Sequence, residues 1–328
     1  MKKLKICINW AASCGGCDVS VLDVEEKILD LIEIADIIYW PVAMDFKRDF
    51  LKSFEPKSID IGIFNGAVRT SEQKEDAEIL REKCKVLIAY GACACYGGIP
   101  GLANLANRDE IFNIVYKETP STENPEFITP KTEVSINKEK IFLPEFFESV
   151  YALNQVVDVD YYVPGCPPVR EQVEALIEVA KKYHETGELP PKGSVFASEK
   201  SLCYECDRNK LKEVIKLDKI HRVHEVIPDE RCLLEQGIIC LGPITRGGCG
   251  QRCINVNMPC RGCFGPLPDM VDPGAEGLSA IVGVFGKDED YKPPAAIPRV
   301  LENIRDVVGT FYRFTLPSSI LSKKLEEE

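Results

Sequence analysis

The sequence predicts an α/β protein, in which a doubly wound, mostly parallel sheet precedes a mostly irregular region with a few helices. Short apolar runs alternate with longer amphipathic ones over the first 190 residues, as in a sheet with helices on both faces. The short runs are mostly apolar, which is typical of strands buried on both faces. From Cys232 to Pro268 the chain is dominated by Cys, Gly and Pro, and apolar periodicity is weak there.

Each expected element rests on the period of its apolar residues. The expected strands are Leu4–Asn9, Ile37–Tyr39, Ile59–Phe64, Val86–Tyr90 and Val159–Val163. The expected helices are Val19–Ile34, Glu72–Lys83, Val169–Tyr183, a stretch around Lys210–Val223, Gly277–Phe285 and Pro298–Phe311. The polar, proline-bearing segment between Lys117 and Lys140 predicts an insertion loop outside the sheet.

A segment of Gly, Pro and small residues, Thr186–Ser198, predicts the boundary between two domains. We expect a flavodoxin-like domain over residues 1–190 and a second domain over residues 191–328. The second domain is poor in apolar periodicity. Something other than apolar burial must therefore hold it together.

The composition excludes several classes of function. The chain is 45% hydrophobic and 28% charged, the balance of a globular protein. Its net charge of −12 would repel nucleic acid and anionic membranes, so neither is an expected partner. We find no run of about 18 apolar residues and no cleavable leader at the start, so we expect a cytoplasmic protein.

The cysteines are the most informative residues. There are fifteen, and eight of them fall between Cys203 and Cys263. Free thiols at this density in a reducing compartment indicate metal ligands.

In the first domain, cysteines follow three of the expected strands. Cys14 and Cys17 come after the first strand, Cys93 after the fourth and Cys166 after the fifth. Loops at the carboxyl edge of a doubly wound sheet converge, so we expect these four thiols to form one set. Cys95 could replace Cys93, and spacing alone leaves this open.

Individual cysteines also have simpler interpretations than metal binding. A CxxC beside a βαβ pattern can be a thioredoxin-like dithiol, although a dithiol needs no third and fourth cysteine. Cys7 and Cys84 are expected in the core. The histidines, His184, His221 and His224, are expected at solvated helix positions rather than as ligands.

The second domain holds eight cysteines, enough for two sets of four: Cys203, Cys206, Cys232, Cys240, Cys249, Cys253, Cys260 and Cys263. Zinc ribbons also pair CxxC motifs, so a zinc-stabilised scaffold is one alternative. Iron and sulfur are favoured, because twelve plausible ligands in groups of four suggest an electron relay.

Six motifs, taken in order, resemble a known family. CGGC, GACACYGGIP, PGCPP, CYEC, CLLEQGIICLGPITRGGC and MPCRGCFGP resemble the small, electron-transferring subunit of [NiFe] hydrogenases over most of residues 1–285. The all-cysteine ligation and the missing export signal resemble the cytoplasmic methyl-viologen-reducing group. In methanogens and their relatives, that group works with heterodisulfide reductase.

The resemblance implies three [4Fe-4S] clusters. Matched by position, the proximal ligands are Cys14, Cys17, Cys93 and Cys166. The medial ligands are Cys249, Cys253, Cys260 and Cys263. The distal ligands are Cys203, Cys206, Cys232 and Cys240. Many members have a histidine where Cys203 stands, some lack a fourth medial cysteine, and the spacing from Cys232 to Cys240 is longer than usual.

The resemblance also implies a division of labour. The chain lacks the paired CxxC motifs near each end that bind nickel in a hydrogenase large subunit, so we expect no catalytic residue here. Hydrogen would be split in that large subunit, and electrons would pass to an iron-sulfur acceptor subunit leading to heterodisulfide reductase. A related subunit of respiratory complex I is the alternative, but it would explain only the first domain.

Overall fold

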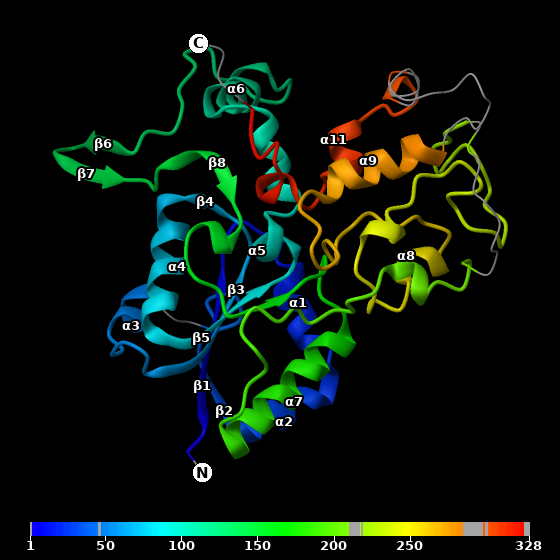
Figure 1. Ribbon diagram of the computed structural model, residues 1–328. Helices are drawn as coiled ribbons and strands as arrows, with labels where there is room; N and C mark the ends of the chain where they lie inside the picture. Colours follow the sequence, from blue (N-terminus) through cyan, green and yellow to red (C-terminus); the bar gives the residue numbers. More distant parts are fainter. Residues whose placement is uncertain are drawn as a thin grey trace.

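The central sheet has five parallel strands in the order β2-β1-β3-β5-β9 (Figure 1). The computed structural model describes residues 2–44, 47–209, 217, 219–284, 298 and 301–324. The strands are β1 (Leu4–Trp10), β2 (Ala35–Tyr39), β3 (Ile59–Asn65), β5 (Cys84–Tyr90) and β9 (Tyr161–Val163). Counted among themselves, they follow the order 2-1-3-4-5 of flavodoxin-like sheets, so the predicted fold class is confirmed.

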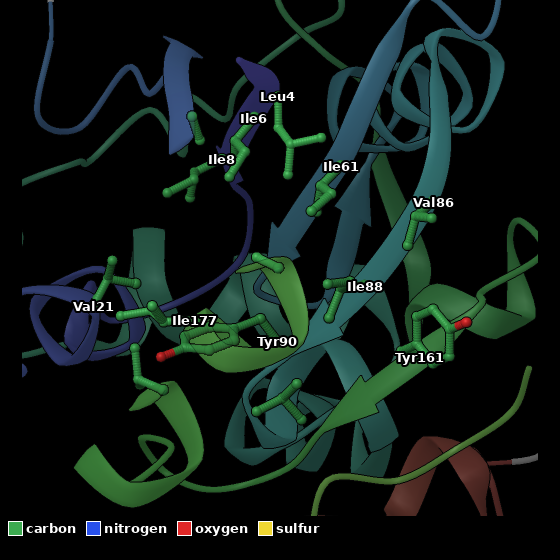
Figure 2. Packing of buried hydrophobic residues seen from close by; sticks show 14 of the residues in the cluster. Leu4, Ile6, Ile8, Val21, Ile61, Val86, Ile88, Tyr90, Tyr161 and Ile177 are labelled. Carbon is green, nitrogen blue, oxygen red and sulfur yellow. The ribbon is translucent and has the colours of Figure 1, made fainter. Parts of the chain in front are cut away.

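Helices cover both faces of this sheet (Figure 1). One face packs on α1 (Gly16–Leu22), α2 (Ile28–Ile34) and α7 (Arg170–Thr186). Figure 2 shows this core, in which Ile8 and Ile88 of the sheet lie on the same side as Ile177 of α7. The other face packs on α3 (Arg48–Lys52), α4 (Ser71–Lys83) and α5 (Ala92–Tyr96).

Local signals explain where the covering helices begin and end. Thr70 caps α4, because its hydroxyl accepts from the Gln73 amide (3.3 Å) while the Gln73 side chain accepts from the Thr70 amide (3.1 Å). Gly187 ends α7 in the left-handed conformation, at φ 74°. The predicted single helix Val19–Ile34 is wrong: Glu25, at φ 55°, interrupts it, and the short 3-10 helix Glu25–Lys27 separates α1 from α2.

The segment between the fourth and fifth strands of the sheet is partly regular. It lies outside the central sheet, as predicted, but it contains a hairpin that the sequence did not predict, β6 (Glu133–Ile136) and β7 (Glu139–Phe142). Asn137 and Lys138 both have positive φ, as a two-residue hairpin turn requires. The other elements are β4 (Val68–Thr70), β8 (Phe146–Tyr151), α6 (Arg108–Asn113), the π-helix Ile114–Glu118 and the 3-10 helices Ile99–Leu105 and Leu153–Gln155.

The C-terminal region has little regular structure in its described residues. Its elements are α8 (Arg252–Asn255), α9 (Pro273–Val284), α11 (Val307–Phe311) and the 3-10 helices Leu202–Tyr204, Gly242–Ile244 and Leu316–Ser318.

The three helices expected in this region have different outcomes. The expected helix Gly277–Phe285 corresponds to α9, although Phe285 lies outside the described residues. The expected helix Pro298–Phe311 corresponds to helical residues at 298, 301 and 302 and to α11; residues 299–300 lie outside the description, and 303–306 are not helical. Of the expected helix Lys210–Val223, residues 210–216 and 218 lie outside the description, and 219–223 are not helical.

The end of the chain returns to the first region. Pro317 fills the space beside Gly97 and Gly101, where any Cβ would collide with its ring. The Gly98 amide donates to the Phe314 carbonyl (3.0 Å), so this C-terminal segment covers the loop that follows Cys93. Contacts therefore cross the boundary expected near residue 190, and the division into two domains there stays a prediction.

Candidate functional site

Four thiols meet at the carboxyl edge of the sheet. Cys14 and Cys17 follow β1, Cys93 lies in α5 directly after β5, and Cys166 follows β9. Burial raises the pKa of Cys17 well above its usual value, and the charges of Cys93, Cys166 and Cys14 raise it further. Burial and the charges of Cys166 and Cys14 raise the pKa of Cys93 to about 12. The structure thus brings together the four thiols that the strand-end pattern places here. We call them the first group.

Two glycines let the backbone approach these thiols. Gly91, at φ 86°, joins β5 to α5, and a Cβ there would collide with the Cys17 sulfur. Gly98, at φ 58°, lies against Cys93, where a Cβ would come within 2.6 Å of the sulfur. Both positions combine a left-handed backbone with a crowded surrounding, which only glycine tolerates.

Cys93 and Cys95 point to different surroundings. Cys95 is fully buried in the apolar core beneath the sheet, and its thiol donates to the Ala89 carbonyl (3.3 Å). Cys93 is less buried, and the charges of Cys166 and Cys14 act on its pKa, whereas burial is the main cause of the raised pKa of Cys95 and the charges of Cys17 and Cys93 add to it. Cys7 and Cys84 are completely buried with their sulfurs 3.4 Å apart, so their predicted place in the core is confirmed.

A second group of thiols lies beside the first. Cys249, Cys253, Cys260 and Cys263 line a cavity of about 680 Å³, and Cys166 of the first group lines it too. Burial and then the charges of Cys249, Cys166 and Cys253 raise the pKa of Cys263 to about 12. We call these four thiols the middle group.

A third group completes the series. Cys203, Cys206, Cys232 and Cys240 together line a cavity of about 170 Å³. Burial and then the charges of Cys240, Cys232 and Cys206 raise the pKa of Cys203 to about 12. The longer spacing before Cys240 therefore does not remove it from the other three. We call these four thiols the last group.

Adjacent groups are in contact. Cys166 of the first group acts on the pKa of Cys263 in the middle group, and Cys240 of the last group acts on that of Cys260. The Cys260 amide donates to the Cys240 sulfur at 3.3 Å. The Gln251 side chain bonds both the backbone and the carboxylate of Asp207, tying the loop of the middle group to that of the last group. The order in space is therefore first, middle, last.

The thiols of the last group surround a cavity rather than a single point. In the part of the chain that the structure describes, no three His, Cys, Asp or Glu side chains converge closely enough to hold a single metal ion. The four thiols of the last group instead line the wall of one cavity. Four cysteine thiols around one cavity could hold an iron-sulfur cluster.

The histidines lie away from these thiols. His184 is on α7, as expected, and its Nε2 lies 3.2 Å from the Lys2 carbonyl. His221 and His224 are in non-helical segments, so their expected helix positions are wrong for the described residues. None of the three lines a thiol cavity.

Sequence reasoning missed three arginines. Arg246, Arg261 and Arg313 line the cavity of the middle group. Arg246 and Arg261 lie within the cysteine motifs, so their position in the sequence is a signal from which they could have been predicted. Arg313 comes from the segment after α11, fifty residues beyond the last cysteine, and only folding brings it there.

Comparison with known proteins decides the family. Residues 14–180 match the family described as NADH ubiquinone oxidoreductase, 20 Kd subunit. The iron-sulfur subunit of the F420-non-reducing hydrogenase of Archaeoglobus profundus is 38% identical over 98% of this chain and 99% of its own length. A subunit of the F420-non-reducing hydrogenase of Methanothermobacter thermautotrophicus is 40% identical over 100% of this chain and 99% of its own length. The chain belongs to this family of hydrogenase subunits.

A solved structure supports the fold of this hydrogenase subunit. A chain of the [NiFeSe] hydrogenase of Desulfomicrobium baculatum superposes with a TM-score of 0.53 and 17% identity, covering 82% of this chain and 97% of that one. The 20 Kd subunit match stops before the middle and last thiol groups begin, whereas the hydrogenase relatives cover all three. The resemblance to a small hydrogenase subunit is therefore confirmed. None of the helices described combines the length and the apolar character that crossing a membrane requires.

Proposed function

We propose that this hydrogenase subunit carries electrons from a [NiFe] large subunit, through three [4Fe-4S] clusters, to an iron-sulfur acceptor subunit. The observation that carries the proposal is the series of three four-thiol groups, each in contact with the next. When bound, such clusters supply one-electron transfer. The role of this chain is to hold the three clusters in sequence between the two partner subunits.

The ligands follow from the three groups. Cys14, Cys17, Cys93 and Cys166 would hold the proximal cluster. Cys249, Cys253, Cys260 and Cys263 would hold the medial cluster. Cys203, Cys206, Cys232 and Cys240 would hold the distal cluster. We choose Cys93 over Cys95 because the Cys95 thiol is fully buried and bonded to Ala89 on the other side of α5.

The surface beside the first group supports a large-subunit interface there. Cys14 and Cys166 are exposed. Trp10, at the end of β1, is 47% exposed, and Leu22 and Ile99, which line the cavity next to Cys166, are about half exposed. Exposed apolar side chains around a reactive site are typical of an interface with another protein.

The acceptor is proposed to dock at the last group. Tyr204, between Cys203 and Cys206, is 76% exposed and offers an aromatic contact beside the distal ligands. We further propose that the complex is cytoplasmic and that its acceptor leads to heterodisulfide reductase, because the relatives belong to F420-non-reducing hydrogenases and include proteins of the methanogen genera Methanothermobacter, Methanocaldococcus and Methanococcus. Identifying the chains that purify with this one tests that link.

Metal analysis tests the ligand assignment. An anaerobic preparation should contain about twelve iron and about twelve acid-labile sulfide atoms per chain. A preparation with about four iron atoms and stoichiometric zinc would refute the middle and last groups as cluster sites and favour the zinc-stabilised alternative.

Activity assays test the division of labour. The purified chain alone should not reduce viologen with hydrogen, whereas the chain mixed with its large partner should. Turnover by this chain in the absence of any nickel protein would overturn the whole proposal.

A further inference from the structure

The cavity of the middle group has an excess of positive charge. Within the described residues, Arg246, Arg261 and Arg313 line it without forming an ion pair with any carboxylate. Arg246 is 9% exposed, and its Nε has no hydrogen-bond partner; only its Nη1 bonds, to the Ser198 carbonyl at 3.3 Å. Arg313 donates from its Nε to the Gly309 carbonyl (2.9 Å), which leaves its charge uncompensated.

The two other arginines of the same cavity are paired with carboxylates. Arg170 pairs with Glu25 at 2.9 Å and with Glu174 at 2.8 Å. Arg252 also lines the middle cavity, and its Nη2 bonds both carboxylate oxygens of Glu171, at 3.0 and 2.8 Å. Its side chain is 56% exposed. Pairing and solvent therefore cancel most of its field, whereas the field of a buried, unpaired arginine reaches the cavity with little screening.

Arg261 lies within reach of two thiol groups. It stands between Cys260 and Cys263, and burial and the nearby Arg313 lower its pKa. The charges of Cys240, Cys260 and Cys253 raise the pKa of Arg261, so its guanidinium interacts with thiols of both the middle and the last group. Arginine stays protonated under all physiological conditions, so this charge is permanent.

The other two groups are less positive. Beside the first group lies Asp18, whose carboxylate accepts from Trp40 at 2.8 Å and whose charge raises the pKa of Cys17. The last group has one lining arginine, Arg208, which bonds carbonyls of neighbouring loops. Acidic groups partly oppose the middle arginines: Asp23 and Glu25 line the same cavity, Glu25 paired with Arg170, and a Glu205 oxygen lies 3.9 Å from the Cys249 sulfur.

We propose that Arg246, Arg261 and Arg313 raise the reduction potential of the cluster held by Cys249, Cys253, Cys260 and Cys263. This rests on the proposed function. One electron arriving from the proximal site adds one negative charge to the medial site, and the same electron then leaves for the distal site. Positive charge that is buried, at Arg246, or half-buried, at Arg261 and Arg313, stabilises the site while it holds that electron, so the reduced state is favoured there.

The test is a redox titration followed by EPR on the complex of this chain with its large subunit. The medial signal is assigned as the one altered in Cys249→Ser. In Arg261→Gln the midpoint potential of this signal should shift to more negative values. Arg261→Lys keeps the charge, so its midpoint potential should stay close to that of the wild-type chain. Arg252→Gln is the matched control, since it also adjoins a cysteine of this group and lines the same cavity.

The outcomes separate this inference from the proposed function. A shift in Arg252→Gln as large as in Arg261→Gln, or no shift in Arg261→Gln at full iron content, would overturn it. If Arg261→Gln loses iron, Arg313→Gln, which adjoins no cysteine, decides by the same criterion. A wild-type chain with no iron at the middle group would instead refute the proposed function itself.

Discussion

The two regions of this hydrogenase subunit are stabilised in different ways. In residues 2–190, two apolar clusters pack on opposite faces of the sheet, and two of the four thiols, Cys14 and Cys166, are exposed at its edge. The C-terminal region has one apolar cluster around α9 and α11. A second cluster there contains Cys240 and Cys260 among its buried members, with Cys206 and Cys249 packed against it.

The two regions are expected to differ in whether the fold forms before its thiol site is occupied. The sheet can form on apolar burial and then present its edge loops, since Cys17 is the one thiol of the first group that belongs to its core clusters. The loops of the middle and last groups have few regular hydrogen bonds, and their thiols are part of the core. Binding of the clusters should therefore contribute folding free energy mainly to the C-terminal region.

Removal of iron should have the largest effect. Anaerobic chelation should abolish protection from amide hydrogen exchange at Leu233 and Ile238, beside the last group, while β3 and β5 stay protected. The reason is that the sheet keeps its apolar core and the C-terminal loops lose their ligand bonds. Equal loss of protection in both regions, measured by mass spectrometry, would show that the sheet also depends on the clusters.

The next effect distinguishes the two cysteines of α5. Cys93→Ser should lose about four iron atoms per chain. Cys95→Ser should keep its iron and lose about 1 kcal/mol of stability, because a hydroxyl can still donate to the Ala89 carbonyl. Iron analysis and thermal unfolding measure the two results. If Cys95→Ser is the variant that loses iron, the proximal assignment moves by two residues.

Backbone crowding at the first group should give a smaller but distinct effect. Gly91→Ala should reduce iron at the proximal site and destabilise the chain by more than the control Gly187→Ala. Both glycines have positive φ, but only at Gly91 does the added Cβ meet a sulfur, whereas Gly187 faces open space. The control should cost about 1–2 kcal/mol from backbone strain alone. Equal unfolding temperatures and iron contents would show that the proximal loop adapts to a Cβ.

The smallest effect should come from the ion pair between the regions. Glu171→Gln removes the partner of Arg252, and Glu178→Gln removes an exposed pair with Lys181 inside α7. Both carboxylates are mostly exposed, so each change should alter the free energy of unfolding by less than about 1 kcal/mol. A cost of several kcal/mol for Glu171→Gln alone, in denaturant titrations, would mean that this pair fixes the C-terminal region to the sheet.

Much of the first region could be predicted because its signals are local. A strand buried on both faces needs a mostly apolar run, and β1, β3 and β5 lie within one or two residues of the expected ranges. The order of strands and cysteines then placed Cys14, Cys17, Cys93 and Cys166 at one edge, since parallel strands end on the same side of a sheet.

Two expectations about secondary structure were wrong because of the backbone conformation of a few residues. Glu25 adopts a left-handed backbone that its residue type does not favour, and the helix expected across it divides. The hairpin of β6 and β7 depends on a turn at Asn137 and Lys138, and the polar residues around this turn give no clear strand pattern in the sequence. Such choices are set by the balance of packing around a residue rather than by its own preference.

The sequence by itself predicted the five strands of the central sheet and singled out twelve thiols, because periodicity and spacing are properties of neighbours along the chain. Only the tertiary structure decided which side of α5 each thiol faces, whether Cys240 stays with Cys203, and that Arg313 reaches the middle cavity. These are contacts between segments far apart in sequence, and they depend on how the C-terminal segment packs back against the loop after Cys93.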